Sequence, residues 1–209
     1  MLVGVLLKGI VVGIIIAVPV GPVGVLCVRR TIFSGRLAGF LSGMGAATAD
    51  AIYGIIAGFG LTVISDWLLD FQDWLRVIGA AYLLYLGISV FLTEPQPRPP
   101  TGLDPDLWRY YVSTFVLTIT NPVTIVAFLA IFTAVGFVGR EATLAGAATL
   151  VVGVWIGSLL WWLALSQGAG LFRNSFGQRQ LRWINRGSGG ILVMSGIGLA
   201  ATLIRTHLG

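Results

Sequence analysis

Charged side chains are scarce in this sequence. Of its 209 residues, 10% are charged and 56% are hydrophobic, whereas a soluble globular domain carries about a quarter charged residues. The mean hydropathy of +0.93 points the same way. So few charges cannot cover a protein of this size with a surface that faces water. We therefore expect lipid to surround most of the molecule.

Cysteine and histidine are almost absent. Cys27 is the only cysteine and His207 the only histidine. One cysteine forms no intramolecular disulfide and no Cys-x-x-Cys redox pair, and one residue of each kind cannot build a Cys/His metal site. No nucleophile motif or phosphate-binding loop is present either. The sequence therefore predicts a protein that is not an enzyme, with no catalytic residues, no cofactor and no metal.

Acidic residues are fewer than basic ones. Eight acidic side chains accompany thirteen lysines and arginines, which leaves a net charge of +5. Because the basic residues lie between apolar stretches, they indicate membrane orientation and contact with anionic lipid, not nucleic acid. The expected partners are a small-molecule substrate and membrane lipid, and no nucleic acid. A homodimer stays open, because small-residue stripes serve packing within a chain and between chains equally well.

Long apolar stretches fill nearly the whole chain. A helix needs about 20 apolar residues to cross a hydrocarbon core of about 30 Å. Lys8 lies inside the first stretch and no small-residue cleavage site follows it, so we interpret this stretch as a span and not as a signal peptide. The predicted spans cover residues 2–28, 37–64, 75–92, 108–137, 142–165 and 188–204.

Two connections have compositions of their own. Residues 94–107 hold five of the eight prolines, which predicts an extended linker outside the lipid. Residues 171–186 bring apolar side chains to one side of a helix and three arginines to another, which predicts a basic amphipathic helix on an anionic leaflet. A loop that only carries positive charge is the alternative. The residues concerned are Phe172, Phe176, Trp183 and Ile184 on the apolar side, and Arg179, Arg182 and Arg186 on the basic side.

Basic residues also predict the orientation. With six spans, nine of the thirteen fall on the first, third and fifth connections or beside them, and four fall on the other side. Because cytoplasmic connections carry the excess of lysine and arginine, we expect a multi-pass protein of the cell (inner) membrane. Its odd-numbered connections would be cytoplasmic and both termini outside. Lys8 works against this orientation, because it could hold the N-terminus inside.

The two halves of the chain echo each other. Residues 18–22 (VPVGP) in the first span correspond to residues 119–122 (ITNP) in the fourth, and Gly35-Arg36 corresponds to Gly139-Arg140. Each half has three spans, so the second copy must cross the membrane in the opposite sense, as in secondary transporters. Chance similarity between apolar helices is the alternative. The predicted fold is an all-α membrane protein of about six transmembrane helices, as two inverted three-helix repeats in residues 1–93 and 108–209.

Asp50 is the only acidic residue deep inside a predicted span. A charge at that depth must face the bundle interior or a wet cavity. It also lies on a stripe of small residues, where membrane helices pack closely. Asp50 could exchange a proton or pair with a substrate ammonium group. A purely structural hydrogen bond to Tyr53, Asn121 or a threonine is the alternative. The stripe consists of Gly39, Gly43, Ala47, Asp50, Gly54 and Gly58.

Prolines interrupt the first and fourth spans at corresponding places. A broken membrane helix exposes amide donors on one half and carbonyl acceptors on the other, which suits the carboxylate and ammonium of an amino acid. Ordinary kinks are the alternative, and the fourth-span threonines could only satisfy freed backbone groups. We expect Trp155, Trp161 and Trp162 on the fifth span to pack, with lining of a pathway as the alternative. The predicted substrate or proton pathway consists of Asp50, Pro19, Gly21, Pro22, Tyr53, Thr118, Asn121 and Pro122.

Several short motifs together resemble the lysine exporter (LysE/RhtB-type) family of amino-acid exporters. No single motif is decisive, but their order and spacing run over essentially the whole chain. They are Pro19–Pro22, Gly35–Gly39, Gly45–Tyr53, Leu117–Pro122, Phe128–Phe132, Gly157–Trp162 and Ile184–Gly189.

This resemblance implies about six helices and gradient-driven export of amino acids or similar metabolites, without naming the solute. With the intramembrane carboxylate, it leads to the hypothesis of a proton-coupled exporter whose site lies between the first, second and fourth spans. Two alternatives stay open. One is export of another small solute or cation, and the other is a structural membrane subunit that transports nothing.

Overall fold

The structure is a computed structural model that describes residues 2–18, 21–58, 72–94, 107–121, 124, 128, 144–172 and 177–208. Every regular element in these ranges is a helix, so the prediction of an all-helical chain is confirmed. The helices are α1 (Leu2–Ala17), α2 (Pro22–Ser34), α3 (Arg36–Gly58), α5 (Gln72–Leu92), α6 (Leu107–Ile119), α8 (Leu144–Leu171) and α9 (Gln178–Leu208).

Two of the described helices are long and apolar enough to cross a membrane, Arg36–Ala57 of α3 and α8. A third span results if α1 and α2 form one broken helix, since they meet at a bend of 84°. The described residues therefore have the two or three apolar spans of a membrane protein. Most of the proline-rich linker predicted at residues 94–107 lies outside the described residues.

The ends of α2 follow from local chemistry. Pro22 is its first residue, where the missing amide hydrogen costs no helical bond. The preceding Gly21 has an extended backbone. At the other end, Gly35 has a φ of 103°, which suits glycine, and its amide donates to the carbonyl of Arg30. The end predicted for the first span, at residue 28, does not coincide with a helix end, because α2 continues through Arg29 and Arg30 to Ser34.

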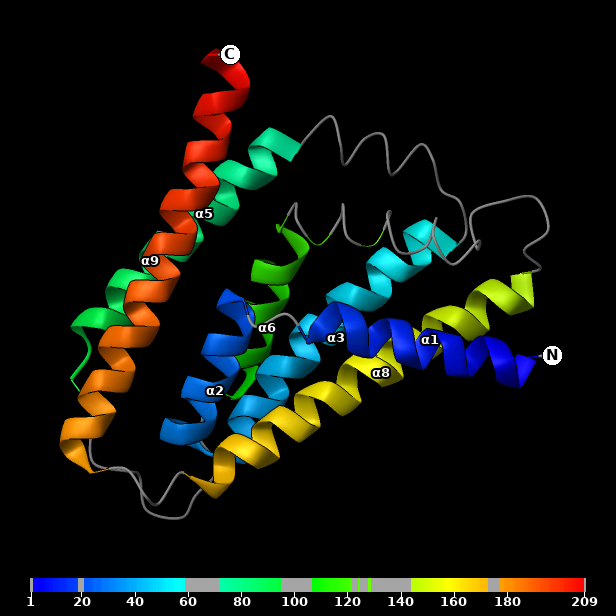
Figure 1. The fold of residues 1–209 in the computed structure, drawn as a ribbon, viewed down its shortest axis with the longest axis horizontal. Coiled ribbons are helices and arrows are strands. Elements are labelled where there is room, and N and C mark those ends of the chain that lie inside the picture. Colours follow the sequence, from blue (N-terminus) through cyan, green and yellow to red (C-terminus); the bar gives the residue numbers. More distant parts are fainter. Residues whose placement is uncertain are drawn as a thin grey trace.

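Glycines bring α1 and α8 into close contact. A Cβ atom added at Gly9 would lie 2.9 Å from the Cα atom of Gly153, and one at Gly13 or Gly157 would also collide with backbone of the other helix. Small residues four apart allow two membrane helices to approach this closely. The pair α1 and α8 is therefore held by backbone-to-backbone packing (Figure 1).

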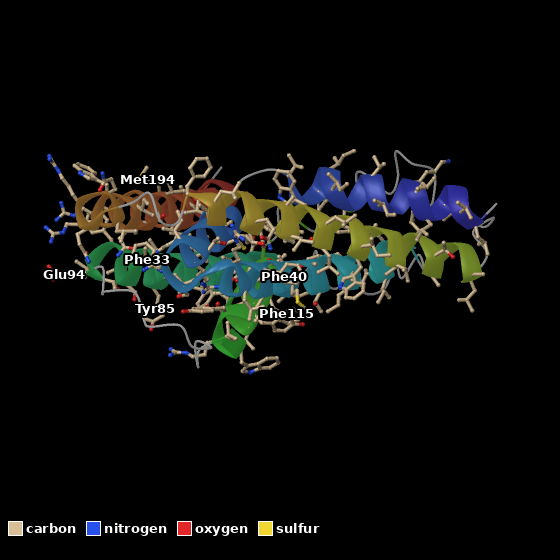
Figure 2. All side chains as sticks on the ribbon, turned by 90° about the horizontal axis from the view of Figure 1, so that it is seen from below. Phe33, Phe40, Tyr85, Glu94, Phe115 and Met194 are labelled. Atoms are coloured by element: carbon tan, nitrogen blue, oxygen red, sulfur yellow. The ribbon has the colours of Figure 1, made fainter. Side chains whose placement is uncertain are left out.

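Glycines also allow α5 and α9 to pack backbone against backbone. A Cβ atom at Gly189 would lie 2.7 Å from the Gly87 carbonyl oxygen, and one at Gly196 would lie 3.1 Å from the Ala80 carbonyl oxygen. Figure 1 shows this pair on the left, apart from α1 and α8 on the right, with α2 and α6 between them. Viewed from below, the exposed side chains of Tyr85 and Met194 project from opposite faces of the pair (Figure 2).

Helix α3 is the centre of the described structure. It packs against α2, α6 and α8. Gly43 allows the close approach of α8, and Gly45 allows that of α6. A Cβ atom at the first would collide with the side chain of Trp162, and one at the second would lie 3.0 Å from the amide nitrogen of Phe115. The predicted small-residue stripe on this helix thus packs inward, which buries Asp50.

The amphipathic helix predicted over residues 171–186 is not a separate element where the structure describes it. α8 continues to Leu171, residues 173–176 lie outside the described residues, and Gln178 already begins α9. From Gln178 on, its residues belong to α9, because one stripe of inward-facing residues continues along α9 past residue 188, where the sixth span was predicted to begin. It consists of the buried residues Leu181, Asn185, Ser188 and Leu192, spaced four, three and four apart.

Candidate functional site

A cavity of about 530 Å³ lies where the broken first helix meets α3 and α6. Every described helix contributes to its wall, and α5 and α9 close one side through Gly79 and Ser195. The residues that line it are Ile16, Ala17, Gly21, Pro22, Val23, Ala46, Asp50, Gly79, Leu83, Leu117, Thr118, Asn121, Thr124, Trp162, Ser195, Gly198 and Leu199.

Among the described residues, Asp50 supplies the only carboxylate in this wall. Its side chain is 4% exposed, and its Oδ2 atom accepts a hydrogen bond of 2.7 Å from the Ser158 hydroxyl on α8. The Trp162 indole in turn donates to Ser158 Oγ at 3.1 Å. Because an indole N–H can only donate, it occupies a lone pair of Ser158 and directs the serine proton toward Asp50. The chain of bonds therefore holds one carboxylate oxygen from the α8 side.

The ends of two helices border the cavity with opposite polarity. Gly21, Pro22 and Val23 form the N-terminal end of α2, whereas Leu117 and Thr118 belong to the last turn of α6. The first amides of a helix lack internal acceptors and its last carbonyls lack internal donors. The α2 end is thus partly positive and the α6 end partly negative. One cavity offers complementary ends to a small dipolar solute.

Tyr53 lies behind the cavity and not in its wall. Its side chain is 2% exposed, and its hydroxyl donates to the carbonyl of Ile119, the last residue of α6. That carbonyl has no partner within its own helix because the helix stops there. Tyr53 therefore links α3 to the interrupted end of α6.

Five of the eight pathway residues predicted from sequence line this one cavity: Asp50, Gly21, Pro22, Thr118 and Asn121. The Thr118 hydroxyl also donates to the Thr114 carbonyl of its own helix, so it serves the backbone as well as the wall. Pro19 and Pro122 lie outside the described residues. The interruption predicted near Asn121 coincides with the end of α6 at Ile119.

Sequence reasoning missed Ser158 as the partner of Asp50 and underrated Trp162. The two residues are four apart on α8, a spacing that places side chains on the same helix face. That spacing was the available signal, but it does not say which distant residue the pair contacts. Ser195 and Gly79, which bring α9 and α5 to the cavity, carried no signal of their own.

No group of three or more His, Cys, Asp or Glu side chains gathers in the described residues as a metal site would require. The cavity chemistry in that part of the chain comes from one carboxylate, hydroxyls, an amide and helix ends.

Comparison with known proteins gives one family and several relatives. The model of the family described as LysE type translocator matches residues 14–203. The "Putative amino acid efflux protein YcgF" of Bacillus subtilis (strain 168) is 28% identical over 210 residues, which covers 97% of this chain and 98% of the relative. The "Uncharacterized membrane protein YahN" of Escherichia coli (strain K12) is 28% identical over 158 residues, 73% of this chain and 70% of the relative. No solved structure matches significantly.

Proposed function

This chain belongs to the LysE type translocator family, and we propose that it exports amino acids or related small metabolites in exchange for protons. The observation that carries the proposal is the cavity between the broken helices, in which Asp50 is the one carboxylate that the described residues contribute. The relative named for amino acid efflux supports the choice of solute. As a member of this family the chain is a membrane exporter. The solute, the coupling ion and the pathway residues belong to the proposal.

Recognition of an amino acid would use both helix ends. The solute carboxylate would lie at the first turn of α2, where Pro22 and Val23 line the cavity and the helix end is partly positive. The ammonium group would lie between Asp50 and the last turn of α6, where carbonyls and a carboxylate attract it. Most of the remaining wall is apolar, including Leu83, Leu117 and Trp162. We therefore expect a neutral aliphatic amino acid to fit better than a cationic one.

Proton exchange would occur at Asp50. Ser158 holds Oδ2, which leaves Oδ1 for the cavity that Asp50 lines. A proton that binds the carboxylate would weaken its attraction for the ammonium group, and loss of the proton would restore it. Proton entry from the outside would thus release the solute there. This is the sequence of events that antiport requires.

Inverted repeats would give this site two alternating openings. Exchange of the halves maps α1 onto α6, α3 onto α8 and α5 onto α9. The packed pairs follow that pattern, because α1 with α8 corresponds to α6 with α3, while α3 with α8 and α5 with α9 each correspond to themselves. This supports the division into residues 1–93 and 108–209 with six spans. We also keep the inner-membrane location, the cytoplasmic odd-numbered connections and the outward termini as part of the proposal.

The test is uptake of labelled amino acids into everted membrane vesicles, with and without an imposed proton gradient. Asp50→Asn should abolish gradient-driven uptake of a neutral aliphatic amino acid, because asparagine neither charges nor exchanges a proton. Glu94→Gln is the matched control, since it neutralises an exposed acid at the end of α5, and it should transport normally.

Uptake that survives in a folded Asp50→Asn variant would refute the role of Asp50 and keep the exporter. If the folded parent takes up no amino acid at all, the amino-acid proposal is wrong, and labelled cations and other metabolites are the next panel. A structural subunit without transport would show, at most, a change of stability in Asp50→Asn.

A further inference from the structure

Arg30 is a buried cation that the carboxylate site does not use. It lies on α2, and its side chain is only 7% exposed. One guanidinium nitrogen, Nη1, shares its two protons among three acceptors, Thr114 Oγ1 at 2.7 Å, Ser42 Oγ at 2.9 Å and the Tyr110 carbonyl at 3.0 Å. The other, Nη2, donates to Ser113 Oγ at 2.6 Å. All four acceptors are uncharged, although buried charges are usually paired with an opposite charge.

The hydroxyls around Arg30 are set up as acceptors. Ser42 Oγ donates its proton to the Ala38 carbonyl of its own helix at 2.9 Å. Thr114 and Ser113 donate theirs to the Tyr110 carbonyl at 3.0 and 3.1 Å. Each hydroxyl thus donates its proton to a carbonyl of its own helix and accepts from the guanidinium with a lone pair. The Tyr110 ring lies 4.8 Å from the guanidinium carbon and adds a cation–π contact.

These contacts form a layer at one end of the cavity, which we call the Arg30 layer: Arg30, Ser42, Tyr110, Ser113 and Thr114. Ser42 is four residues from Ala46 of the cavity wall, and Thr114 is four from Thr118, so each lies about 6 Å along its helix from the cavity. On α2 the layer is seven residues beyond Val23, or about 10 Å. The layer therefore lies between the cavity and the turn that joins α2 to α3.

The residue next to Arg30 binds the other side of the bundle. Arg29 Nε donates to Asn185 Oδ1 on α9 at 2.8 Å, and Asn185 Nδ2 donates to the Thr93 carbonyl after α5 at 2.8 Å. Asn185 is 1% exposed. Two consecutive arginines of α2 thus tie this short helix to α3 and α6 on one side and to the α5 and α9 pair on the other.

We propose that the Arg30 layer is a gate of the transport pathway, closed in this structure, and that it opens when α2 moves away from α6. This rests on the proposed function only in that a solute passes through the cavity. α2 is a separate short helix joined by a bend to α1, so it can tilt without carrying α1 along. Uncharged acceptors suit a gate, because water can replace each of them without leaving a carboxylate unpaired in the bundle.

The lone cysteine reports on this gate. Cys27 is 2% exposed and lies on α2 between Val23 of the cavity wall and Arg30. Its thiol is therefore sealed from the face of the α2–α3 turn while the layer is closed. A charged maleimide that cannot cross lipid would reach Cys27 from that face only when the layer opens.

The experiment measures the rate of Cys27 alkylation in everted and in right-side-out vesicles, without any solute. In the parent chain labelling should be slow from the α2–α3 face, which we expect to be exposed in everted vesicles. Arg30→Ala should accelerate it at least tenfold from that face. Arg36→Gln is the matched control, because Arg36 is an exposed arginine that begins α3, and it should label at the parental rate. Cys27→Ser should not label at all.

If Arg30→Ala does not fold, Thr114→Val removes one acceptor from Arg30 while preserving side-chain shape, and it should accelerate labelling by a smaller factor. An unchanged rate in a folded Arg30→Ala or Thr114→Val protein would overturn the gate, and so would acceleration from the opposite face only. Accelerated labelling in a protein that takes up no amino acid would keep the gate and refute the solute assignment. The two proposals therefore fail separately.

Discussion

Two buried charges lie in neighbouring parts of the same helix junction and are held in opposite ways. At Arg30, four oxygen acceptors converge on a cation that is sealed from the cavity. At Asp50, two hydrogen bonds form a chain: the Trp162 indole donates to Ser158, and Ser158 donates to the Asp50 carboxylate. This carboxylate borders the cavity. Neither charge meets an opposite charge among the described residues.

The difference shows that the other hydrogen bond of a hydroxyl decides whether the hydroxyl accepts from a cation or donates to an anion. Ser42 gives its proton to its own helix, so only its lone pairs remain for Arg30. Ser158 has a lone pair filled by the indole of Trp162, so its proton is directed to Asp50. The same side chain type thus serves a cation in one place and an anion in the other. Substitutions that reverse one of these charges or remove one of these hydrogen bonds should therefore change stability or uptake by different amounts at the two sites.

The largest effect is expected from reversing the charge in the sealed region. Arg30→Glu would direct an acceptor toward hydroxyl lone pairs and a carbonyl, and should lower the free energy of unfolding by about 3–5 kcal/mol. Asp50→Asn keeps the shape and an oxygen for Ser158, and should change it by less than about 1 kcal/mol. Denaturation titrations in detergent micelles measure both. Similar losses in the two variants would mean that the two charges are equally sealed.

The next effect concerns the donor to Asp50. Ser158→Ala removes a hydrogen bond to a charged group, worth about 1.5–3 kcal/mol, so solute uptake should fall about tenfold or more. Ser166 is an equally buried serine on the same helix whose hydroxyl donates only to the Leu163 carbonyl. Ser166→Ala should therefore keep normal uptake per folded protein. Equal losses in both variants would assign the effect to α8 packing.

A smaller effect is expected from removing one acceptor of Arg30. Thr114→Val should lower the free energy of unfolding by about 1.5 kcal/mol, because a bond from a charged donor is lost. Thr149 makes the same hydroxyl bond to its own helix, to the Ala145 carbonyl, and its hydroxyl accepts no side-chain hydrogen bond from the described residues. Thr149→Val should stay within about 0.5 kcal/mol of the parent. The two variants can be compared in one series of thermal melts. Equal melting temperatures would contradict a stabilising role for the bond from Arg30 to the Thr114 hydroxyl.

The smallest effect concerns the donor behind Ser158. Trp162→Phe keeps an aromatic ring in the cavity wall but removes the indole donor, which costs about 1 kcal/mol. Uptake should fall about fivefold, less than in Ser158→Ala. Trp155 lies on the same helix with its side chain 40% exposed, so Trp155→Phe controls for the loss of an indole. An uptake loss in Trp162→Phe no larger than in this control would mean that the Ser158 proton needs no second bond to face Asp50.

The helical fold and the interruptions near Gly21 and Asn121 were predictable, because they follow from apolar length and from proline and glycine chemistry. The inward position of Asp50 was also predictable from its stripe of small residues. Its partner was not, since Ser158 is 108 residues away and nothing local distinguishes it from other serines. The six spans and the inverted repeat remain predictions.

Arg30 could not be placed from the sequence. Two arginines after an apolar stretch ordinarily mark the membrane surface, and only the arrangement of α3 and α6 shows that one of them is buried. The separate amphipathic helix over residues 171–186 failed for a related reason. Exposed arginines and an exposed Trp183 suggested an interfacial face, whereas buried Leu181 and Asn185 belong to the inward stripe of α9.

The bond from Tyr53 to the Ile119 carbonyl has a consequence for biogenesis. It joins two segments 66 residues apart, and the later one carries the carbonyl that its own helix leaves without a donor. Because a ribosome makes the earlier segment first, the phenol is already in the membrane when α6 arrives from the insertion machinery. The interrupted helix therefore meets its donor on entry. A chain made with its halves in reverse order would have to shelter that carbonyl until α3 followed.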